Sequence, residues 1–104
     1  MTAYVIVDAE VLDEERARAY RALAEPSIAL HGGRYLVQGT VPEAAEGSWP
    51  SPSRVMTVVE FPDMDRLKEW YTSREYKQAK AARRTAIELR LLFVEGRPQE
   101  AKTA

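Results

Sequence analysis

The stretch HGGRYLV, residues 31–37, marks the point where a helix ends and a strand begins. Glycine readily adopts the left-handed backbone conformation that ends many helices, so Gly32 is expected to close the helix. Arg34 then opens an apolar strand over residues 34–40. The junction also places the only histidine of the chain beside an arginine and a tyrosine, which makes it a candidate site.

The residues before the junction predict a strand followed by a helix. Residues 4–11 alternate with the period of two that is typical of a strand. One face carries Val5, Val7, Ala9 and Val11, and the other carries Tyr4, Ile6, Asp8 and Glu10. Asp13 is a suitable N-cap for the amphipathic helix that follows. Pro26 falls inside this helix and predicts a kink or a break near residues 23–25.

The residues after the junction predict a loop, two strands and a helical region. Residues 41–53 contain three prolines and form a long loop, and residues 54–61 alternate again as a strand. Asp63 is expected to cap the next helix. Thr72 begins a T-x-x-E pattern, which predicts that a new helical turn starts there. Residues 87–95 then form the last strand.

The order β-α-β-β-α-β predicts an α+β fold, a ferredoxin-like sandwich with an antiparallel sheet and both helices on one face. The other sheet face would then be uncovered, and its apolar residues favour a homodimer that packs sheet against sheet. We expect one domain over residues 1–96 and a C-terminal tail over residues 97–104.

Composition excludes several kinds of chemistry. The chain has no cysteine, which rules out disulfides, thiol nucleophiles, zinc–thiolate sites and iron–sulfur clusters. It also lacks a phosphate-binding loop, a dinucleotide fingerprint and a nucleophile elbow. A single histidine argues against a dedicated metal site. We therefore expect neither a metal nor another cofactor.

Charge and hydropathy bear on partners and location. The formal net charge is −1, which gives no general bias toward nucleic acid or membranes. Residues 74–84 hold five basic side chains against one acidic side chain, but a solvated helix face is the preferred interpretation over RNA or phosphate binding. The N-terminal residues have no signal-peptide pattern, and no apolar run is long enough to cross a membrane. A cytoplasmic protein is expected.

The order and spacing of several short stretches resemble a known family over residues 3–96. These stretches are Tyr4-Val5-Ile6-Val7, Tyr20 with Pro26, Gly32-Gly33-Arg34-Tyr35-Leu36-Val37, Glu46-Gly47 with Trp49, Glu60-Phe61-Pro62, Trp70-Tyr71 with Ser73 and Tyr76, Arg83, and Val94-Glu95-Gly96. They resemble the small bacterial proteins of domain-of-unknown-function family 1330, within the dimeric α/β-barrel superfamily. The resemblance implies a homodimer with its two sheets face to face, and it implies no assigned reaction.

The resemblance also shows one departure and a range of activities. The family typically carries an arginine before the terminal glycine of its second strand, and this chain has Gln38 there. An anion-binding role of that arginine would therefore not transfer to this chain. The wider superfamily includes cofactor-free monooxygenases, haem-degrading enzymes, isomerases, cyclases and ligand-binding proteins, so the fold alone selects none of them.

Three residues are candidate catalytic groups. His31 is the only side chain whose ordinary pKa lies near neutrality, although a histidine at a helix C-terminus also has a purely structural role. Arg34 is suited to holding a carboxylate, or it pairs with Asp8 or Glu60 on a neighbouring strand. Asp8 interrupts an apolar strand, so it is either an acid/base group or a paired structural carboxylate.

A second set of residues is predicted to bind a substrate. The set is Tyr35, Gln38, Glu46, Trp49, Glu60 and Tyr71. The strand residues among them need polar partners or water, which either a cavity or an interface would supply. The loop tryptophan covers a pocket or docks against a partner subunit, and the aromatic residues of the helices also suit a core.

These patterns favour a small homodimer that binds a small organic molecule between its helices and its sheet. It is either a cofactor-independent enzyme, such as an isomerase, cyclase, lyase or monooxygenase, or a non-catalytic ligand-binding or stress-associated module. A third hypothesis is a nucleic-acid accessory protein that uses the basic helix.

Overall fold

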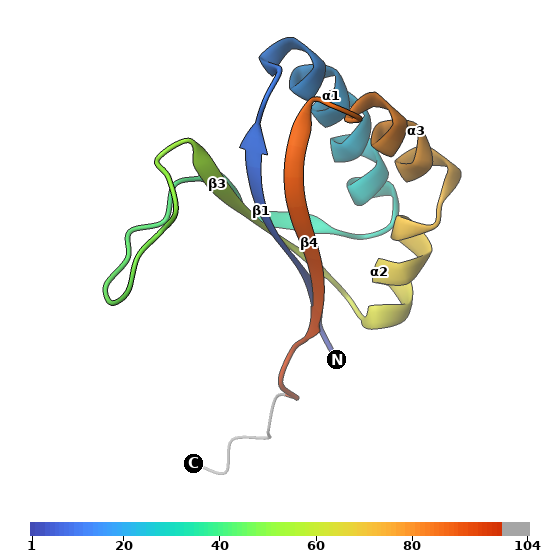
Figure 1. Cartoon of the computed structure of the whole chain (residues 1–104). Coiled ribbons are helices and arrows are strands. Elements are labelled where there is room, and N and C mark those ends of the chain that lie inside the picture. Colours follow the sequence, from blue (N-terminus) through green and yellow to red (C-terminus); the bar gives the residue numbers. More distant parts are fainter. Residues whose placement is uncertain (99–104) are drawn as a thin grey trace, which may run out of the picture.

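The computed structural model describes residues 1–98, in which a four-stranded antiparallel sheet carries three helices on one side (Figure 1). The strands are β1 (Ala3–Val11), β2 (Arg34–Thr40), β3 (Arg54–Phe61) and β4 (Ile87–Glu95), and the helices are α1 (Glu14–Leu30), α2 (Met64–Tyr71) and α3 (Arg74–Ala82). The strand order is β2-β3-β1-β4, so the predicted ferredoxin-like fold is confirmed. Most of the predicted tail, from residue 99 on, lies outside the described residues.

The central strand β1 sets the register of the sheet. Val5 lies opposite Val59 of β3 and opposite Phe93 of β4. The odd-numbered residues of β1 face the helices, as the alternation predicts, and Val5 is fully buried. The pairing of β2 with β3 shifts register on either side of Val37, which indicates bulges in this edge strand.

Helix α1 is continuous through its proline. Asp13 is the N-cap, and its side chain accepts a hydrogen bond from the backbone N–H of Arg16. Pro26 lies inside the helix, so the predicted break at residues 23–25 is wrong. A proline removes one backbone donor, and the buried residues around it, Ser27 and Ile28 among them, hold this part of the helix against the protein.

The junction between α1 and β2 needs two glycines for two different reasons. Gly32 has a φ of 81°, the left-handed conformation predicted for it after the C-cap His31. Gly33 is required by close packing, because a Cβ atom there would lie 2.7 Å from the ring of Phe61 and 2.8 Å from a methyl group of Ile28. The second glycine therefore lets the chain pass directly over the core.

The two C-terminal helices are capped by Asp63 and Ser73. Asp63 caps α2 as predicted, with its carboxylate accepting from the N–H of Arg66. A new helix begins here as predicted, but its N-cap is Ser73 and not Thr72. Thr72 instead ends α2, and its hydroxyl donates to the carbonyl of Lys68 at 2.9 Å.

The hydrophobic core lies at one end of the sheet, which we call the packed end. It joins Ala3 and Val5 of β1 with Val59, Phe61 and Phe93 on the adjacent strands. The ring of Trp70, from α2, packs 5.3 Å from Phe61 and 4.2 Å from Tyr76, measured between ring centroids. In the described part of the chain, no helix is long and apolar enough to cross a membrane.

Candidate functional site

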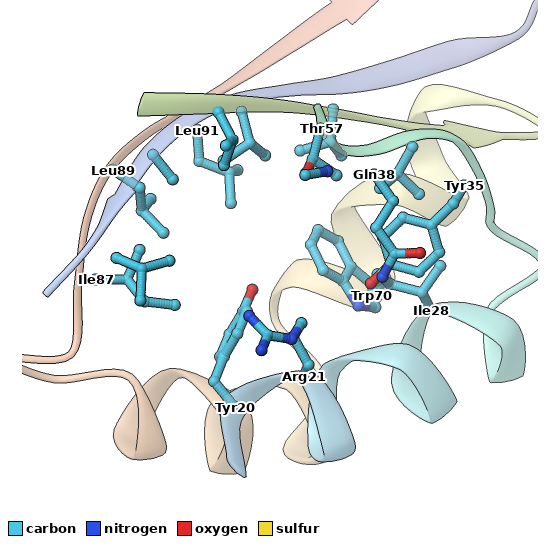
Figure 2. A pocket seen from close by; sticks show the side chains of 17 residues that line it. Tyr20, Arg21, Ile28, Tyr35, Gln38, Thr57, Trp70, Ile87, Leu89 and Leu91 are labelled. Atoms are coloured by element: carbon cyan, nitrogen blue, oxygen red, sulfur yellow. The ribbon is translucent and has the colours of Figure 1, made fainter. Parts of the chain in front are cut away.

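A cavity of about 110 Å³ lies between α1 and the helix-facing side of the sheet. Its strand residues include Val7, Ala9, Val55, Leu89, Leu91 and Tyr35, and its helix residues include Tyr20, Arg21 and Trp70. Figure 2 shows an open space with Leu91 and Thr57 on one side and Tyr20 and Arg21 across from them.

The cavity forms because nothing large fills this end of the sheet. The inward residues of β1 beyond Val5 are Val7, Ala9 and Val11, and each is only half-buried. The two phenylalanines of the chain both belong to the packed end, where they pair with Ala3 and Val5. We call the part of the sheet that carries Val7, Ala9, Val11, Val55 and Leu89 the hollow end.

Six side chains with polar atoms line this apolar space, and five of them have hydrogen-bond partners. The hydroxyl of Tyr20 lies 3.0 Å from the hydroxyl of the buried Tyr76. The amide of Gln38 donates to Glu25 at 2.7 Å, and Arg21 donates to Glu14 at 2.9 Å. The hydroxyl of Thr57 accepts from the backbone N–H of Gly39 at 3.0 Å, and the indole N–H of Trp70 donates to Ser27 at 2.9 Å. The sixth is the hydroxyl of Tyr35.

Both cavity tyrosines are neutral at physiological pH. Burial raises the pKa of Tyr20 far above its ordinary value, and the neighbouring Tyr76 raises it further. Burial also raises the pKa of Tyr35, with the carboxylate of Glu25 adding to the effect. Each phenol is therefore present as a hydrogen-bond donor.

The lining contains no carboxylate and no imidazole. The cavity walls thus offer dispersion contacts, neutral hydrogen bonds and the guanidinium of Arg21, which is 37% exposed. Such a lining suits a mainly apolar molecule with a few polar atoms. Within residues 1–98, no group of three or more histidine, aspartate or glutamate side chains is placed to hold a metal ion.

Of the nine residues predicted to form a site, Tyr35 and Gln38 line this cavity. His31 lies at the end of α1, where its Nδ1 is 2.9 Å from the carbonyl oxygen of Ser27. Arg34 donates to Glu60 at 2.7 Å, which is the structural alternative considered for that arginine. The structure therefore places His31, Arg34 and Glu60 outside the cavity lining.

The remaining loop and helix candidates also lie outside the cavity lining. Trp49 is half-buried in its own loop, where its indole N–H donates to the carbonyl of Arg54 at 2.8 Å. Glu46 is exposed in the same loop. The hydroxyl of Tyr71 accepts from Lys80 at 3.0 Å, and its ring packs edge-on against Phe93. Their predicted roles in binding stay predictions.

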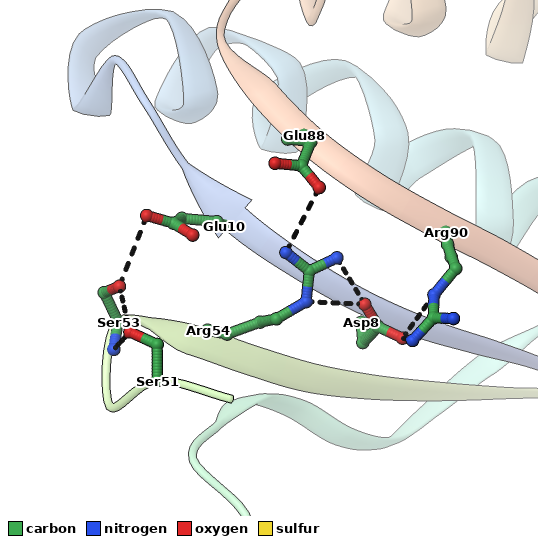
Figure 3. Close-up of polar contacts among 7 residues, drawn as sticks. All are labelled: Asp8, Glu10, Ser51, Ser53, Arg54, Glu88 and Arg90. Atoms are coloured by element: carbon green, nitrogen blue, oxygen red, sulfur yellow. Dashed lines mark hydrogen bonds and ion pairs between the residues drawn. The ribbon is translucent and has the colours of Figure 1, made fainter. Parts of the chain in front are cut away.

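Asp8 lies on the open face of the sheet, in an ionic cluster that spans three strands (Figure 3). Arg54 of β3 donates to one carboxylate oxygen at 2.7 Å, and Arg90 of β4 donates to the other at 3.1 Å. Burial alone would raise the pKa of Asp8, but the bonds from both arginines outweigh it and the pKa lies below its ordinary value. The two guanidinium groups cover this carboxylate, which explains its low exposure on an open face.

An apolar row crosses the open face between the Asp8 cluster and the Arg34–Glu60 pair. The register aligns Val37, Val58, Ile6 and Leu92 in one row across all four strands. Leu92 is 53% exposed and Val37 is 36% exposed. We call this row the aliphatic band. A band of this kind, flanked by charged residues, is typical of a protein interface.

Arg21 was not predicted as a cavity residue, and Tyr20 and Trp70 were expected mainly in the core, with a pocket between the helices and the sheet as the alternative for the aromatic hydroxyls. The aromatic stripes of the helices were assigned mainly to the core, which is correct for Trp70 and Tyr76 at the packed end. The missing signal was the strand register. It places both strand phenylalanines at one end and leaves only small and aliphatic residues beneath the first half of α1.

Comparison with known proteins agrees with this architecture. A family model described as "Domain of unknown function (DUF1330)" matches residues 2–97. No curated protein matches the sequence. A solved structure of a protein of unknown function from Rhodopseudomonas palustris is similar, with a TM-score of 0.75, 16% identity, and coverage of 94% of this chain and 84% of that chain.

Two further solved structures have the same fold. SnoaB, a cofactor-independent oxygenase from Streptomyces nogalater, gives a TM-score of 0.65 at 11% identity, over 97% of this chain and 98% of that chain. A dimeric protein of unknown function with a ferredoxin-like fold, from Bacteroides fragilis, gives 0.56 at 16% identity, over 91% and 96%. At these identities the likeness concerns the fold alone.

Proposed function

We propose two properties for this chain, which belongs to the family described as domain of unknown function (DUF1330). It forms a homodimer, and it binds a small, mainly apolar organic molecule between α1 and the sheet. The observation that carries the proposal is the hollow end. Apolar side chains there face the helices and yet stay half-buried around a cavity. A ligand would complete their burial, at about 25 cal/mol for each Å² of apolar surface removed from water.

The dimensions of the cavity suit a ligand with one ring. Apolar cavities of roughly 150 Å³ bind benzene, and this cavity of about 110 Å³ also reaches the surface beside the exposed residues Gln38 and Gly39. A ring can therefore sit among Val7, Leu89 and Leu91 while a substituent extends toward the opening.

A cavity-filling variant tests the binding proposal. Ala9→Leu adds bulk inside the hollow end, and Ala29→Leu adds the same bulk to the exposed surface of α1. We expect α-methylstyrene, titrated in an NMR experiment, to shift the methyl signals of Val7 and Leu89 in the wild type and in the Ala29 variant. The Ala9 variant should lose these shifts and keep its fold. Equal binding by both variants would contradict the proposal.

The homodimer is proposed through the aliphatic band. Its support is the exposed row on the open face, together with the dimeric neighbour of the same fold. Leu92→Lys places a charge at the β4 end of the aliphatic band, whereas Leu30→Lys changes a leucine on the helix side that is 64% exposed. Sedimentation should show a dimer for the wild type and the Leu30 variant and a monomer for the Leu92 variant. A monomeric wild type at micromolar concentration refutes this part of the proposal.

A cofactor-independent reaction on the bound molecule is a second candidate. The specific observation in its favour is the hydrogen-bonded pair of hydroxyls formed by Tyr20, which lines the cavity, and Tyr76 behind it. The name of one structural neighbour, a cofactor-independent oxygenase, is consistent with it. His31, Arg34 and Asp8 are not part of this candidate, because none of them lines the cavity. The cytoplasmic location stays a prediction.

A further inference from the structure

One wall of the cavity ends in a pair of phenol groups. Tyr20 comes from α1 and lines the cavity, and Figure 2 shows its hydroxyl directed into the open space. Tyr76 comes from α3 and is fully buried behind it. The two oxygens lie 3.0 Å apart, so one hydroxyl donates a hydrogen bond to the other.

Burial decides which hydroxyl donates. The hydroxyl of Tyr76 has the oxygen of Tyr20 as its hydrogen-bond partner. If Tyr76 only accepted, its own hydrogen would remain unpaired in the core, which costs roughly 1–3 kcal/mol. If Tyr76 donates, its hydrogen is satisfied and the hydrogen of Tyr20 is left free. The favoured arrangement therefore aims the Tyr20 O–H at the cavity.

The surrounding side chains hold this arrangement in place. The ring of Tyr76 packs against Trp70 and lies 5.7 Å from Tyr71, between ring centroids. Trp70 is itself fixed by its indole N–H, which donates to Ser27 at 2.9 Å. Tyr76 is therefore unable to turn away from Tyr20, and the position of its hydroxyl is set before any ligand arrives.

A cation lies close to the same pair. The guanidinium carbon of Arg83 is 5.9 Å from the centroid of the Tyr20 ring. Its Nε is buried without a hydrogen-bond partner among the described residues. This positive charge partly opposes the rise in the pKa of Tyr20 that burial and Tyr76 cause.

The geometry points to Tyr20 as the residue that donates a hydrogen bond to the ligand, with Tyr76 as the positioning residue behind it. The ligand class is then an apolar ring compound that carries an acceptor oxygen, such as an aryl ketone or a quinone. This inference rests on the proposed function, since it names the chemistry of the molecule bound in the same cavity.

Because the Tyr20 O–H points into the cavity, a ligand without a hydrogen-bond acceptor is expected to bind more weakly than one that has an acceptor. A hydrocarbon of the same shape would fill the hollow end and leave the Tyr20 hydroxyl without a partner. Its binding would lose the free energy of the hydrogen bond that this hydroxyl makes to water in the empty cavity. A carbonyl oxygen on the ligand would accept this hydrogen bond in place of water. The cavity therefore discriminates between two molecules that differ only in this atom.

Acetophenone and α-methylstyrene are the matched probes, because they have the same heavy-atom skeleton and differ by a carbonyl oxygen in place of a methylene group. Titrations with the wild type, Tyr20→Phe, Tyr76→Phe and the double variant measure the ratio of the two affinities. Infrared spectra of bound acetophenone measure the hydrogen bond at its carbonyl. Tyr35→Phe is the comparison variant, since it removes the other phenol that lines the cavity.

We expect Tyr20→Phe to weaken acetophenone binding about fivefold relative to α-methylstyrene, the size of one ordinary hydrogen bond. The shift of the carbonyl band to lower frequency should disappear with it. Tyr76→Phe should reduce this shift in part, and the double variant should match Tyr20→Phe, because Tyr76 acts through Tyr20. Retained binding of α-methylstyrene shows that each variant is folded.

Two results separate the inference from its premise. If α-methylstyrene fails to bind the wild type, the proposed function is refuted and the inference falls with it. If α-methylstyrene binds and the carbonyl shift survives in Tyr20→Phe, or is lost in Tyr35→Phe instead, the proposed function stands and the assignment to Tyr20 is overturned.

Discussion

The two ends of the helix-facing side of the sheet have the same alternating pattern and opposite packing. At the packed end, Val5, Val59 and Phe61 are buried against Trp70. At the hollow end, Val7 and Leu89 continue the same pattern and line a cavity. Alternation therefore tells which face a residue takes, and it does not tell whether that face is filled. Filling depends on where large side chains meet across the register.

The open face reverses this contrast. Behind the packed end it carries the aliphatic band, and behind the hollow end it carries Asp8 with Arg54 and Arg90. The hollow end thus lacks a dense core on one side but has ionic links between β3, β1 and β4 on the other. The three strands are joined there by charged groups where apolar packing is thin.

The largest expected effect is at the packed end. Phe61→Ala removes a fully buried ring and should lower the free energy of unfolding by about 3–5 kcal/mol. Leu89→Ala truncates a half-buried side chain at the hollow end and should cost about 1 kcal/mol. Urea unfolding of both variants measures the difference. Equal losses would show that the two ends are packed alike.

Gly33→Ala tests how tightly the packed end closes. Its new methyl group would meet the ring of Phe61 and Ile28 at under 3 Å, so the core must shift. We expect a loss of about 1–3 kcal/mol from overpacking. The double variant Gly33→Ala with Phe61→Leu should recover part of this loss, because the smaller side chain leaves room. A single variant as stable as the wild type would mean that this end has unfilled space.

Asp8→Asn tests the ionic links at the hollow end and has the smallest expected effect, about 1 kcal/mol for a partly solvated cluster. The pKa of Asp8 in the folded protein lies below its ordinary value of 3.8, so the carboxylate stabilises the fold above about pH 4. This contribution is lost as the pH falls through the lowered pKa.

Unfolding curves between pH 2 and pH 7 measure this dependence. The wild type should lose more stability than Asp8→Asn as the pH falls, and the two curves should approach each other in acid. Glu95→Gln removes an exposed carboxylate at the end of β4 and serves as the control. Parallel curves for the wild type and Asp8→Asn would show that the ionic cluster does not contribute to the free energy of unfolding.

The strands, the caps at Asp13 and Asp63, and the turn at Gly32 could be predicted from the sequence, because each depends on neighbours in the chain. The two errors arose where tertiary contacts outweigh local preference. Pro26 is tolerated because Ser27 and Ile28 are buried beside it. Thr72 and Ser73 are both plausible caps in the sequence, and the end of α2 selects between them.

The site was less accessible from the sequence. His31, Arg34 and Asp8 were selected for the reactivity of their side chains, and the structure gives each a local partner. Tyr35 and Gln38 were named and do reach the cavity. Tyr20 was hidden in an ordinary helical stripe, because its significance comes from Tyr76, which is 56 residues away.

The half-buried lining of the hollow end has a consequence for how this protein can change over evolutionary time. Substitutions at Val7, Ala9 or Leu89 remove little buried surface, so the fold tolerates them while the shape of the cavity is altered. Residues at the packed end have no such freedom. One end of the sheet thus preserves the fold across divergent sequences, and the other is free to acquire new ligands.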